Sequence, residues 1–460
     1  MPSRATRSQR AGMTLRTSLL VTGCLLLAVG CGDAAGPDFP ALAILTDSLP
    51  RALPDVEYAQ IVEASGGDMS YAWSLASGSA PLPAGLTLST TGEVTGIPTL
   101  SGTFPFTVRV ASGDGQAAER PFSIAVPPVL EPQESCRDYP AHAIVAFEDA
   151  MLEAMVRWRA EYDLGTSLDA DLTCTLVAQL TRLSNGQANV EIASLVGLQN
   201  LTGLTELALG DAVSVSDVGP VAALQGLTYL HLGNNSIVDI GPLSGLTNLT
   251  LLSLRDNMVS DVTPLAGLVN LEVLWLGRGA FSYAQTFAIP EVRGDPITDI
   301  SALSGLVNLD ELWIHGQAIT NLDALSGMTS LTELNAYNNA IADIGGVADH
   351  PTIETLQLDS NAISDVSPLA GLTNLAGVLL RDNAITDLMG VEGLTGLVEI
   401  RLEANLDLAD IRPLLDNPGL GGPYPEFGGR DLVGLSSTNV TCEDVALLEA
   451  KDIIVFSDCP

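Results

Sequence analysis

Residues 227–248 read LTYLHLGNNSIVDIGPLSGLTN, and residues 249–270 read LTLLSLRDNMVSDVTPLAGLVN. The second stretch keeps the apolar residues of the first at the same places within the unit. The leading apolar residue of this unit recurs at Leu227, Leu249, Leu271, Leu309, Leu331, Ile353, Leu375 and Leu397. We count nine units across residues 204–417. Repetition at a fixed period of this length predicts a solenoid in which each unit is one coil.

The spacing within a unit predicts how each coil is built. Leu230 and Leu232 alternate with other residues, which is typical of a short strand with one face in a core. After Gly241-Pro242 turns the chain, Leu243 and Leu246 return to the same core. Because one coil cannot bury this apolar face alone, it needs neighbouring coils.

Two polar series recur with the repeat. An asparagine stands where the chain leaves the strand, at Asn235, Asn257, Asn339, Asn361, Asn383 and Asn405. A buried amide there can satisfy backbone groups of adjacent coils, so we predict a structural ladder. An aspartate recurs on the return leg, at Asp239, Asp261, Asp299, Asp343, Asp365 and Asp387. We interpret these as solvated turn carboxylates, with calcium binding as the alternative.

These units, together with the helical segment that begins at Phe147, resemble the internalin-like bacterial leucine-rich-repeat family. The resemblance implies the fold class: an α/β leucine-rich-repeat solenoid of the 22-residue bacterial type, curved, with parallel strands on its concave side. It also implies that a partner binds to that side. The chain departs from the family pattern because another module precedes the repeats and because the ending Ser457-Asp458-Cys459-Pro460 shows no cell-wall sorting tail.

The preceding module, residues 41–127, alternates apolar and other residues over short runs, as in Tyr71, Trp73 and Leu75. This period of two, with glycine and proline between runs, predicts an all-β sandwich. The text from Leu82 to Phe104 resembles the Ig-like modules of bacterial surface proteins. We expect Trp73 to be a core residue rather than a sugar platform. The proline-rich residues 128–135 are predicted to form a stiff linker.

Residues 1–30 carry four arginines and then an apolar run from Leu19 to Val29, which predicts an export signal. Residues 27–31 resemble a bacterial lipobox, so we expect Cys31 to be lipidated and residues 31–40 to form a tether. A second match at Cys24 and an ordinary signal with a chance cysteine are the alternatives. Removal of the signal takes the net charge from −36 to −40, and Lys451 is the only lysine. Such a chain repels nucleic acid.

Four cysteines remain, and an even number in an exported chain suggests disulfides. We predict a C-terminal cap over residues 418–460, with a helix from Cys442 to Ala450, a last strand at 453–456 and a closing bridge to Cys459. The matching pair is Cys136 with Cys174, in an N-terminal cap and degenerate first repeat over residues 136–203. A helix there has Met151, Leu152, Met155 and Trp158 on one apolar stripe, which we expect to pack inward.

The binding residues are predicted from the strand geometry. Residues two, four and six places after each leading leucine project from the concave face, because those at three and five point inward. Trp275 and Trp313 hold equivalent places in successive units and should stack at the strand spacing. An insertion at residues 279–294 should rim them. The full candidate set is Tyr229, His231, Trp275, Phe281, Tyr283, Phe287, Glu311, Trp313, His315, Glu333 and Tyr337.

Two other interpretations of this patch stay open at this point. The aromatic residues of the insertion can fold over the tryptophans as a small private core. The two histidines can instead be metal ligands or acid–base groups, although no third ligand recurs at metal spacing.

No catalytic or cofactor motif occurs in the chain, so we expect a binding protein and not an enzyme, with no cofactor and no metal. The leading hypothesis is a monomeric adhesion or recognition protein of the bacterial cell envelope. It is held by its lipid, in the outer membrane by preference, and contacts a protein or glycan partner. A periplasmic or envelope scaffold is the alternative, and an enzyme that uses His231 or His315 is the third hypothesis.

Overall fold

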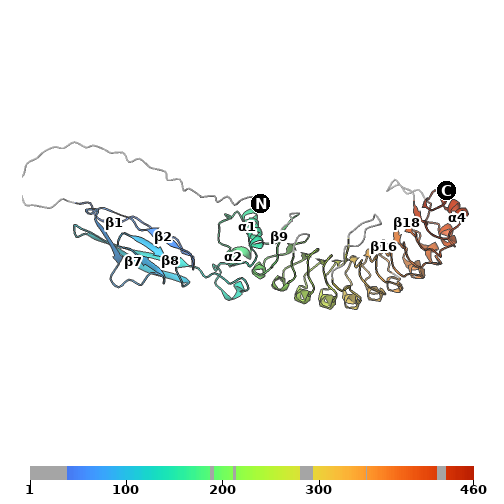
Figure 1. Ribbon diagram of the computed structural model, residues 1–460, viewed down its shortest axis with the longest axis horizontal. Helices are drawn as coiled ribbons and strands as arrows, with labels where there is room; N and C mark the ends of the chain where they lie inside the picture. Colours follow the sequence, from blue (N-terminus) through green and yellow to red (C-terminus); the bar gives the residue numbers. More distant parts are fainter. Residues whose placement is uncertain (1–38, 187–190, 211–213, 280–293, 349, 422–430) are drawn as a thin grey trace, which may run out of the picture.

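A computed structural model describes residues 39–186, 191–210, 214–279, 294–348, 350–421 and 431–460. Figure 1 shows the described parts following one another along the long axis of the molecule: a β-sandwich, a helical cap, a curved row of coils and a second cap. The predicted signal, Cys31 and most of the tether lie outside the described residues.

The N-terminal module is an all-β sandwich, as predicted. One sheet has the order β2-β6-β5, another the order β4-β7-β8, and β1 pairs with β3. The strands are β1 Ala43–Ile44, β2 Tyr58–Ile61, β3 Ala64–Ser65, β4 Tyr71–Leu75, β5 Leu86–Leu88, β6 Glu93–Gly96, β7 Gly102–Ser112 and β8 Ala117–Val126. Trp73 is buried in their core together with Val94, Val108 and Ile124, which confirms its structural assignment.

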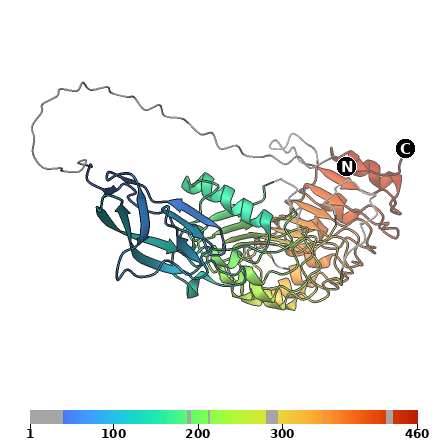
Figure 2. The same cartoon turned by 60° about the vertical axis from the view of Figure 1, so that its left-hand side comes forward.

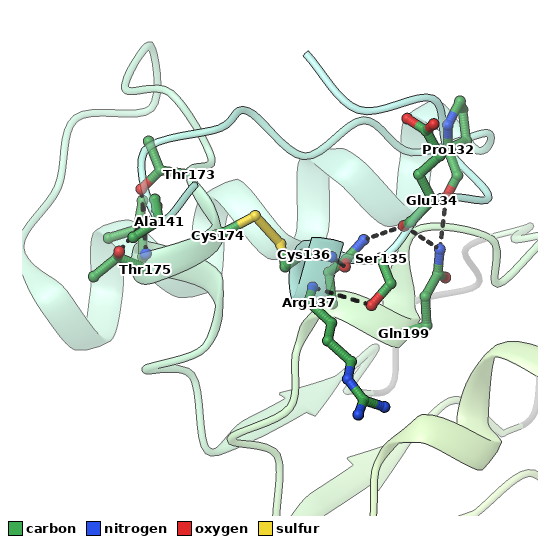
Figure 3. The surroundings of a disulfide bond; sticks show 12 residues. Pro132, Glu134, Ser135, Cys136, Arg137, Ala141, Thr173, Cys174, Thr175 and Gln199 are labelled. Carbon is green, nitrogen blue, oxygen red and sulfur yellow. Dashed lines mark hydrogen bonds between the residues drawn. A yellow bond between two sulfur atoms is a disulfide. The ribbon is translucent and has the colours of Figure 1, made fainter. Parts of the chain in front are cut away.

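The segment predicted as a linker is part of the solenoid's N-terminal cap. Leu130 is buried in the same core as the repeats, and its N–H donates to the carbonyl of Ile144. Gln199 Nε2 donates to the carbonyl oxygens of Pro132 and Glu134 at 2.7 and 3.1 Å (Figure 3). This proline-rich segment is therefore not a free linker, because Leu130 packs in the core of the solenoid.

The N-terminal cap consists of η1 Cys136–Asp138, α1 Ala150–Leu164, α2 Cys174–Val177, β9 Arg182–Ser184 and η2 Leu198–Asn200. The predicted disulfide joins Cys136 to Cys174 (Figure 3). Figure 2 shows α1 beside the first strands of the solenoid's sheet, and it contacts β9. The cap thus covers the apolar end of the row of coils.

The predicted inward stripe of α1 is wrong in part. Leu152, Val156 and Ala160 are the buried residues of this helix, whereas Met151 and Trp158 are exposed. The buried positions are four residues apart and include an alanine, which lets the helix backbone approach the sheet closely. The larger side chains are left on the outer surface.

The repeats form the predicted parallel sheet. Nine strands span the repeat region: β10 Glu206–Ala208, β11 Tyr229–His231, β12 Leu251–Ser253, β13 Val273–Trp275, β14 Glu311–Trp313, β15 Glu333–Asn335, β16 Thr355–Gln357, β17 Gly377–Leu379 and β18 Glu399–Arg401. Each pairs in parallel with the next, so that Leu230, Leu252, Leu274 and Leu312 align in one column. These leucines are fully buried.

The return legs are short 3-10 helices on the side away from the strands. They are η3 Gly219–Ala223, η4 Gly241–Gly245, η5 Thr263–Gly267, η6 Ser301–Gly305, η7 Asp323–Leu325, η8 Gly345–Val347, η9 Ser367–Gly371 and η10 Val391–Gly393. Each recurring aspartate accepts the backbone N–H two residues further on, as Asp239 does from Gly241 at 2.8 Å. This confirms that these carboxylates build turns.

The predicted asparagine ladder is confirmed. Asn257 Oδ1 accepts the N–H of Ile237 in the preceding coil at 3.0 Å, and Asn257 Nδ2 donates to the carbonyls of Leu232 and Leu254 at 2.9 Å each. The other five predicted asparagines bond in the same way. Gln317 takes this role in its own coil, by accepting from Ile297 and donating to Leu276.

The sheet continues beyond the point where the repeat was predicted to stop. After α3 Arg412–Asp416, β19 Leu432–Gly434 and β20 Ile454–Phe456 add to β18, which gives a parallel sheet of 12 described strands. Sequence analysis missed β19 because Ile400 and its partner Val433 lie further apart in the chain than one repeat period. The predicted helix is α4 Cys442–Glu449, and the predicted bridge joins Cys442 to Cys459.

Candidate functional site

The candidate site lies on the concave side of β13, β14 and β15, where Trp275 and Trp313 are direct cross-strand neighbours. Their rings stack with centroids 4.7 Å apart and planes 20° apart, which confirms the predicted pair. Both side chains are half-buried. We call this pair, with Glu311 and Glu333, the tryptophan patch.

Two glutamates line the tryptophan patch. Glu311 Oε1 accepts from Trp275 Nε1 at 2.9 Å. Glu311 and Glu333 are themselves cross-strand neighbours. Desolvation by burial raises the pKa of both carboxyl groups above their ordinary value, and neighbouring carboxylates raise it further.

His315 lies deeper than predicted. His315 is only 3% exposed, and its ring stacks on that of Tyr337 with centroids 4.6 Å apart. The ring fits there because Gly277 has no side chain: a Cβ at Gly277 would lie 2.2 Å from the imidazole. Burial and the nearby Arg255 charge lower the pKa of His315 to about 4. His315 therefore supports the face as a neutral ring and does not project to a partner.

Tyr229 and His231 are set apart from the tryptophan patch. Both belong to β11, and β12 separates that strand from β13. The His231 ring lies over Gly210 of the preceding coil, because a Cβ at Gly210 would come within 2.4 Å of Nε2. The structure thus gathers Trp275, Trp313, Glu311 and Glu333 with the buried His315 and the half-buried Tyr337, and leaves the two β11 residues two strands away.

The two ends of the insertion are tied to the solenoid by a residue that sequence analysis missed. Arg278 is 4% exposed and donates to the carbonyl oxygens of Val259, Gly294 and Asp295 at 2.6, 3.3 and 2.6 Å. Gly279 stands where the ladder asparagine of this coil would be. An arginine next to a position that lacks the ladder asparagine could have been recognised in the sequence as a residue that holds this coil. Phe281, Tyr283 and Phe287 lie outside the described residues.

The next strands of the concave face carry a charge network that was also missed. Arg381 contacts Asp359 and Glu403, each at 3.4 Å, while Arg401 contacts Glu399 and Glu403 at 2.8 and 3.0 Å. Burial raises the pKa of Asp359 to about 6, although Arg381 opposes the shift. Sequence places these residues at concave positions, but the pairing depends on side-chain length across coils.

A second exposed aromatic pair lies on the outer side of α1. Trp158 and Tyr162 stack with ring centroids 5.5 Å apart and are 53% and 72% exposed. The guanidinium of Arg159 lies 5.6 Å from the Tyr162 ring centroid. This pair is off the concave sheet and offers an internal comparison for it.

Two further observations concern the described residues as a whole. Within the described ranges, no group of three or more His, Cys, Asp and Glu side chains could hold a metal ion. The same part of the chain contains no helix that is long and apolar enough to cross a membrane.

Comparisons with known proteins bear on both modules. Residues 41–127 match the family model described as "Putative Ig domain", and residues 225–266 match the model "Leucine Rich repeats (2 copies)". No curated protein matches the chain. Its fold is also similar to solved structures of bacterial leucine-rich-repeat proteins.

An internalin (inlF) from Listeria monocytogenes is 26% identical, with 68% of this chain and 90% of that chain covered and a TM-score of 0.53. Internalin C2 from the same organism is 29% identical, with 55% and 93% covered and a TM-score of 0.41. The functional domain of InlJ, also from L. monocytogenes, is 19% identical, with 64% and 65% covered and a TM-score of 0.43. The chain is therefore an internalin-like leucine-rich-repeat protein with an Ig-like module in front of its solenoid.

Proposed function

We propose that this protein is a recognition or adhesion protein of the bacterial cell envelope that binds a partner protein on its concave face, centred on the tryptophan patch. The stacked, half-exposed pair of Trp275 and Trp313 is the observation that carries the proposal. Large aromatic side chains with partly satisfied polar groups dominate the binding energy of protein interfaces.

The solenoid itself does not need these two rings. The equivalent position is a serine on β12, Ser253, and an asparagine on β15, Asn335, so a coil forms with small or polar residues there. The core of the coils is supplied instead by the buried leucine columns. An aromatic pair at a position where packing does not require one favours a binding role.

A protein partner fits the geometry better than a glycan. Sugars stack on the faces of aromatic rings, but one face of each indole is already covered by the other indole. The Glu311 carboxylate lies 2.9 Å from Trp275 Nε1, so a charged group borders the pair. Such a surface suits apolar and hydrogen-bonding side chains of a protein.

We further propose that the protein lies outside the cytoplasm. Two disulfides in the caps favour a compartment outside the cytoplasm. We place the lipid on Cys31, with the Ig-like module between that anchor and the repeats, in the outer membrane and as a monomer. His315 is buried against Tyr337, and His231 belongs to β11, two strands from β13, which favours a binding role for the tryptophan patch.

A panel of extracellular protein domains and a glycan array test the proposed function. The full mature chain should bind one or more of the proteins, and Trp275→Ala/Trp313→Ala should weaken that binding at least about tenfold, as expected for interface anchors. Trp158→Ala is the matched control, because it removes an exposed tryptophan away from the sheet, and it should bind as the wild type does. Unchanged binding by the double variant would contradict the proposed site, and binding to glycans alone would contradict the protein partner.

An envelope scaffold is the second candidate, and one observation favours it. Trp158 and Tyr162, with Met151, give α1 an exposed apolar stripe on the side of the cap. A scaffold that packs through this lateral surface would lose its partner in Trp158→Ala and keep it in Trp275→Ala/Trp313→Ala. The same pair of variants therefore separates the two functions.

A further inference from the structure

The tryptophan patch contains two carboxylates side by side. Glu311 and Glu333 face each other across β14 and β15 in direct register. Like charges at such positions repel and destabilise a sheet. Glu311 accepts one indole N–H, from Trp275, which uses only part of its acceptor capacity. Burial raises the pKa of both groups, so a positive charge placed between them would be favourable.

The same sheet neutralises its acids elsewhere. On β18 and in the residues that follow β16, β17 and β18, Arg381 and Arg401 pair with Asp359, Glu399 and Glu403. Within the described part of the chain, no arginine or lysine forms an ion pair with Glu311 or Glu333. Among the described residues, the solenoid therefore pairs its acids with arginines at one end of the concave face and not at Glu311 and Glu333.

Further acids surround the pair. Asp310 precedes Glu311 and is exposed, and Glu272 and Glu354 hold the same place before their strands and are exposed as well. Thr332 occupies this position in the coil between them, and its hydroxyl donates to Asp310 Oδ1 at 2.6 Å. The N-terminal ends of β13–β16 thus present a row of carboxylates next to the two indole rings. A partly buried surface whose charges all have one sign favours partners that carry the opposite charge.

We propose that the segment bound at the tryptophan patch is a basic stretch of a partner protein, whose arginine or lysine enters between Glu311 and Glu333. The aliphatic stem of such a side chain would lie along the indole edges, while its charged end would bond to the free carboxylate oxygens. This inference rests on the proposed function and specifies the chemistry of its partner.

A pair of peptides tests the inference. Full-length mature protein is titrated with a fluorescent octapeptide of alternating arginine and serine, and with the corresponding glutamate and serine peptide. Glu311→Gln/Glu333→Gln keeps an amide oxygen for the Trp275 indole N–H and removes both charges. We expect this variant to bind the basic peptide at least about tenfold more weakly, which corresponds to the loss of a charge-assisted hydrogen bond. Its thermal midpoint should equal or exceed that of the wild type.

The matched control is Glu161→Gln/Glu449→Gln, which removes two exposed charges on the caps, away from the patch. This control should keep wild-type affinity for the basic peptide, whereas Trp275→Ala/Trp313→Ala should lose it. Equal weakening in the control and in Glu311→Gln/Glu333→Gln would mean attraction to net charge alone and would overturn the inference.

The failure of the inference is distinguishable from that of the proposed function. If a protein partner from the panel binds normally to Glu311→Gln/Glu333→Gln but not to Trp275→Ala/Trp313→Ala, the concave site stands and the basic partner is wrong. If that partner binds both variants normally, the proposed function fails as well. Loss in both variants supports both proposals.

Discussion

Arg278 shows how a single residue repairs a break in the repeat. Its coil has Gly279 where an asparagine is expected, and the guanidinium donates instead to three backbone carbonyls of the adjoining turns. Burial lowers the pKa of this arginine, but the carbonyl dipoles still surround it with acceptors. The residue closes the two ends of the insertion on the solenoid.

We expect Arg278→Ala to lower the free energy of unfolding by about 3 kcal/mol, because buried carbonyls lose charged donors. Arg182→Ala removes a guanidinium that is 60% exposed at the start of the solenoid and should change stability by no more than about 0.5 kcal/mol. Urea unfolding followed by circular dichroism measures both. Equal stabilities for the two variants would show that Arg278 does not hold the coil.

His315 predicts a dependence of stability on pH. Its folded pKa of about 4 lies below its ordinary value of 6.5, so the folded protein favours the neutral ring. The stabilisation is complete above pH 6.5 and is lost as the pH falls towards 4, by about 3 kcal/mol. His315→Phe keeps a ring against Tyr337 and cannot titrate.

The unfolding free energies of wild type and His315→Phe are measured between pH 4 and 7.5. As the pH falls, the wild type should therefore lose stability relative to the variant. Carboxylates that titrate in the same range are common to both proteins and cancel in the difference. A constant difference across this range would show that the imidazole is accessible to protons.

The depth of His315 marks the limit of what residue spacing predicts. The alternation of the strand correctly gave the register of Trp275 and Trp313, and it gave the stack of the two indoles. It did not give the burial of the His315 imidazole, because that depends on the absence of a side chain at Gly277 in the preceding coil. The hydrogen bond from Trp275 to Glu311 likewise follows from rotamers that spacing does not specify.

Among the elements, strands and turns were predictable and the orientation of the cap helix was not. A buried leucine at the same place in each unit fixes each strand to its neighbours, and an aspartate two positions before a backbone N–H fixes each turn. On α1, the large side chains suggested the wrong inner face, since close packing selected Val156 and Ala160. At the C-terminal end, β19 departs from the period and so gave no repeat signal.

The N-terminal cap should act locally on the coils next to it. The bridge between Cys136 and Cys174 closes a separation of 38 residues, and its loss should cost about 4 kcal/mol by loop closure. Because each coil contacts only its neighbours, we expect Cys136→Ser/Cys174→Ser to speed amide hydrogen exchange in β9 and β10 while β14 keeps its protection. Cys442→Ser/Cys459→Ser should do the same for β19 and β20. Faster exchange spread evenly over the sheet would contradict this one-dimensional coupling.

At the scale of the whole molecule, the concave face of the row of coils is divided into parts with different tasks. The asparagine ladder and leucine columns hold the coils, and the network around Arg381 and Arg401 compensates charge near the C-terminal cap. The tryptophan patch is the part that neither task requires. The period predicted this architecture, whereas the contrast between compensated and uncompensated regions emerged only from side chains of adjacent coils.

The four tryptophans permit one measurement that tests the central claim within a single protein. Hydroxyl-radical oxidation of each tryptophan is compared in the free protein and in its complex with a partner from the protein panel. Trp73 is buried in the sandwich and Trp158 is exposed on α1, so both serve as internal references. Binding at the concave face predicts severalfold slower oxidation of Trp275 and Trp313 in the complex, with Trp158 unchanged. Slower oxidation of Trp158 with no change at Trp275 and Trp313 would contradict the account.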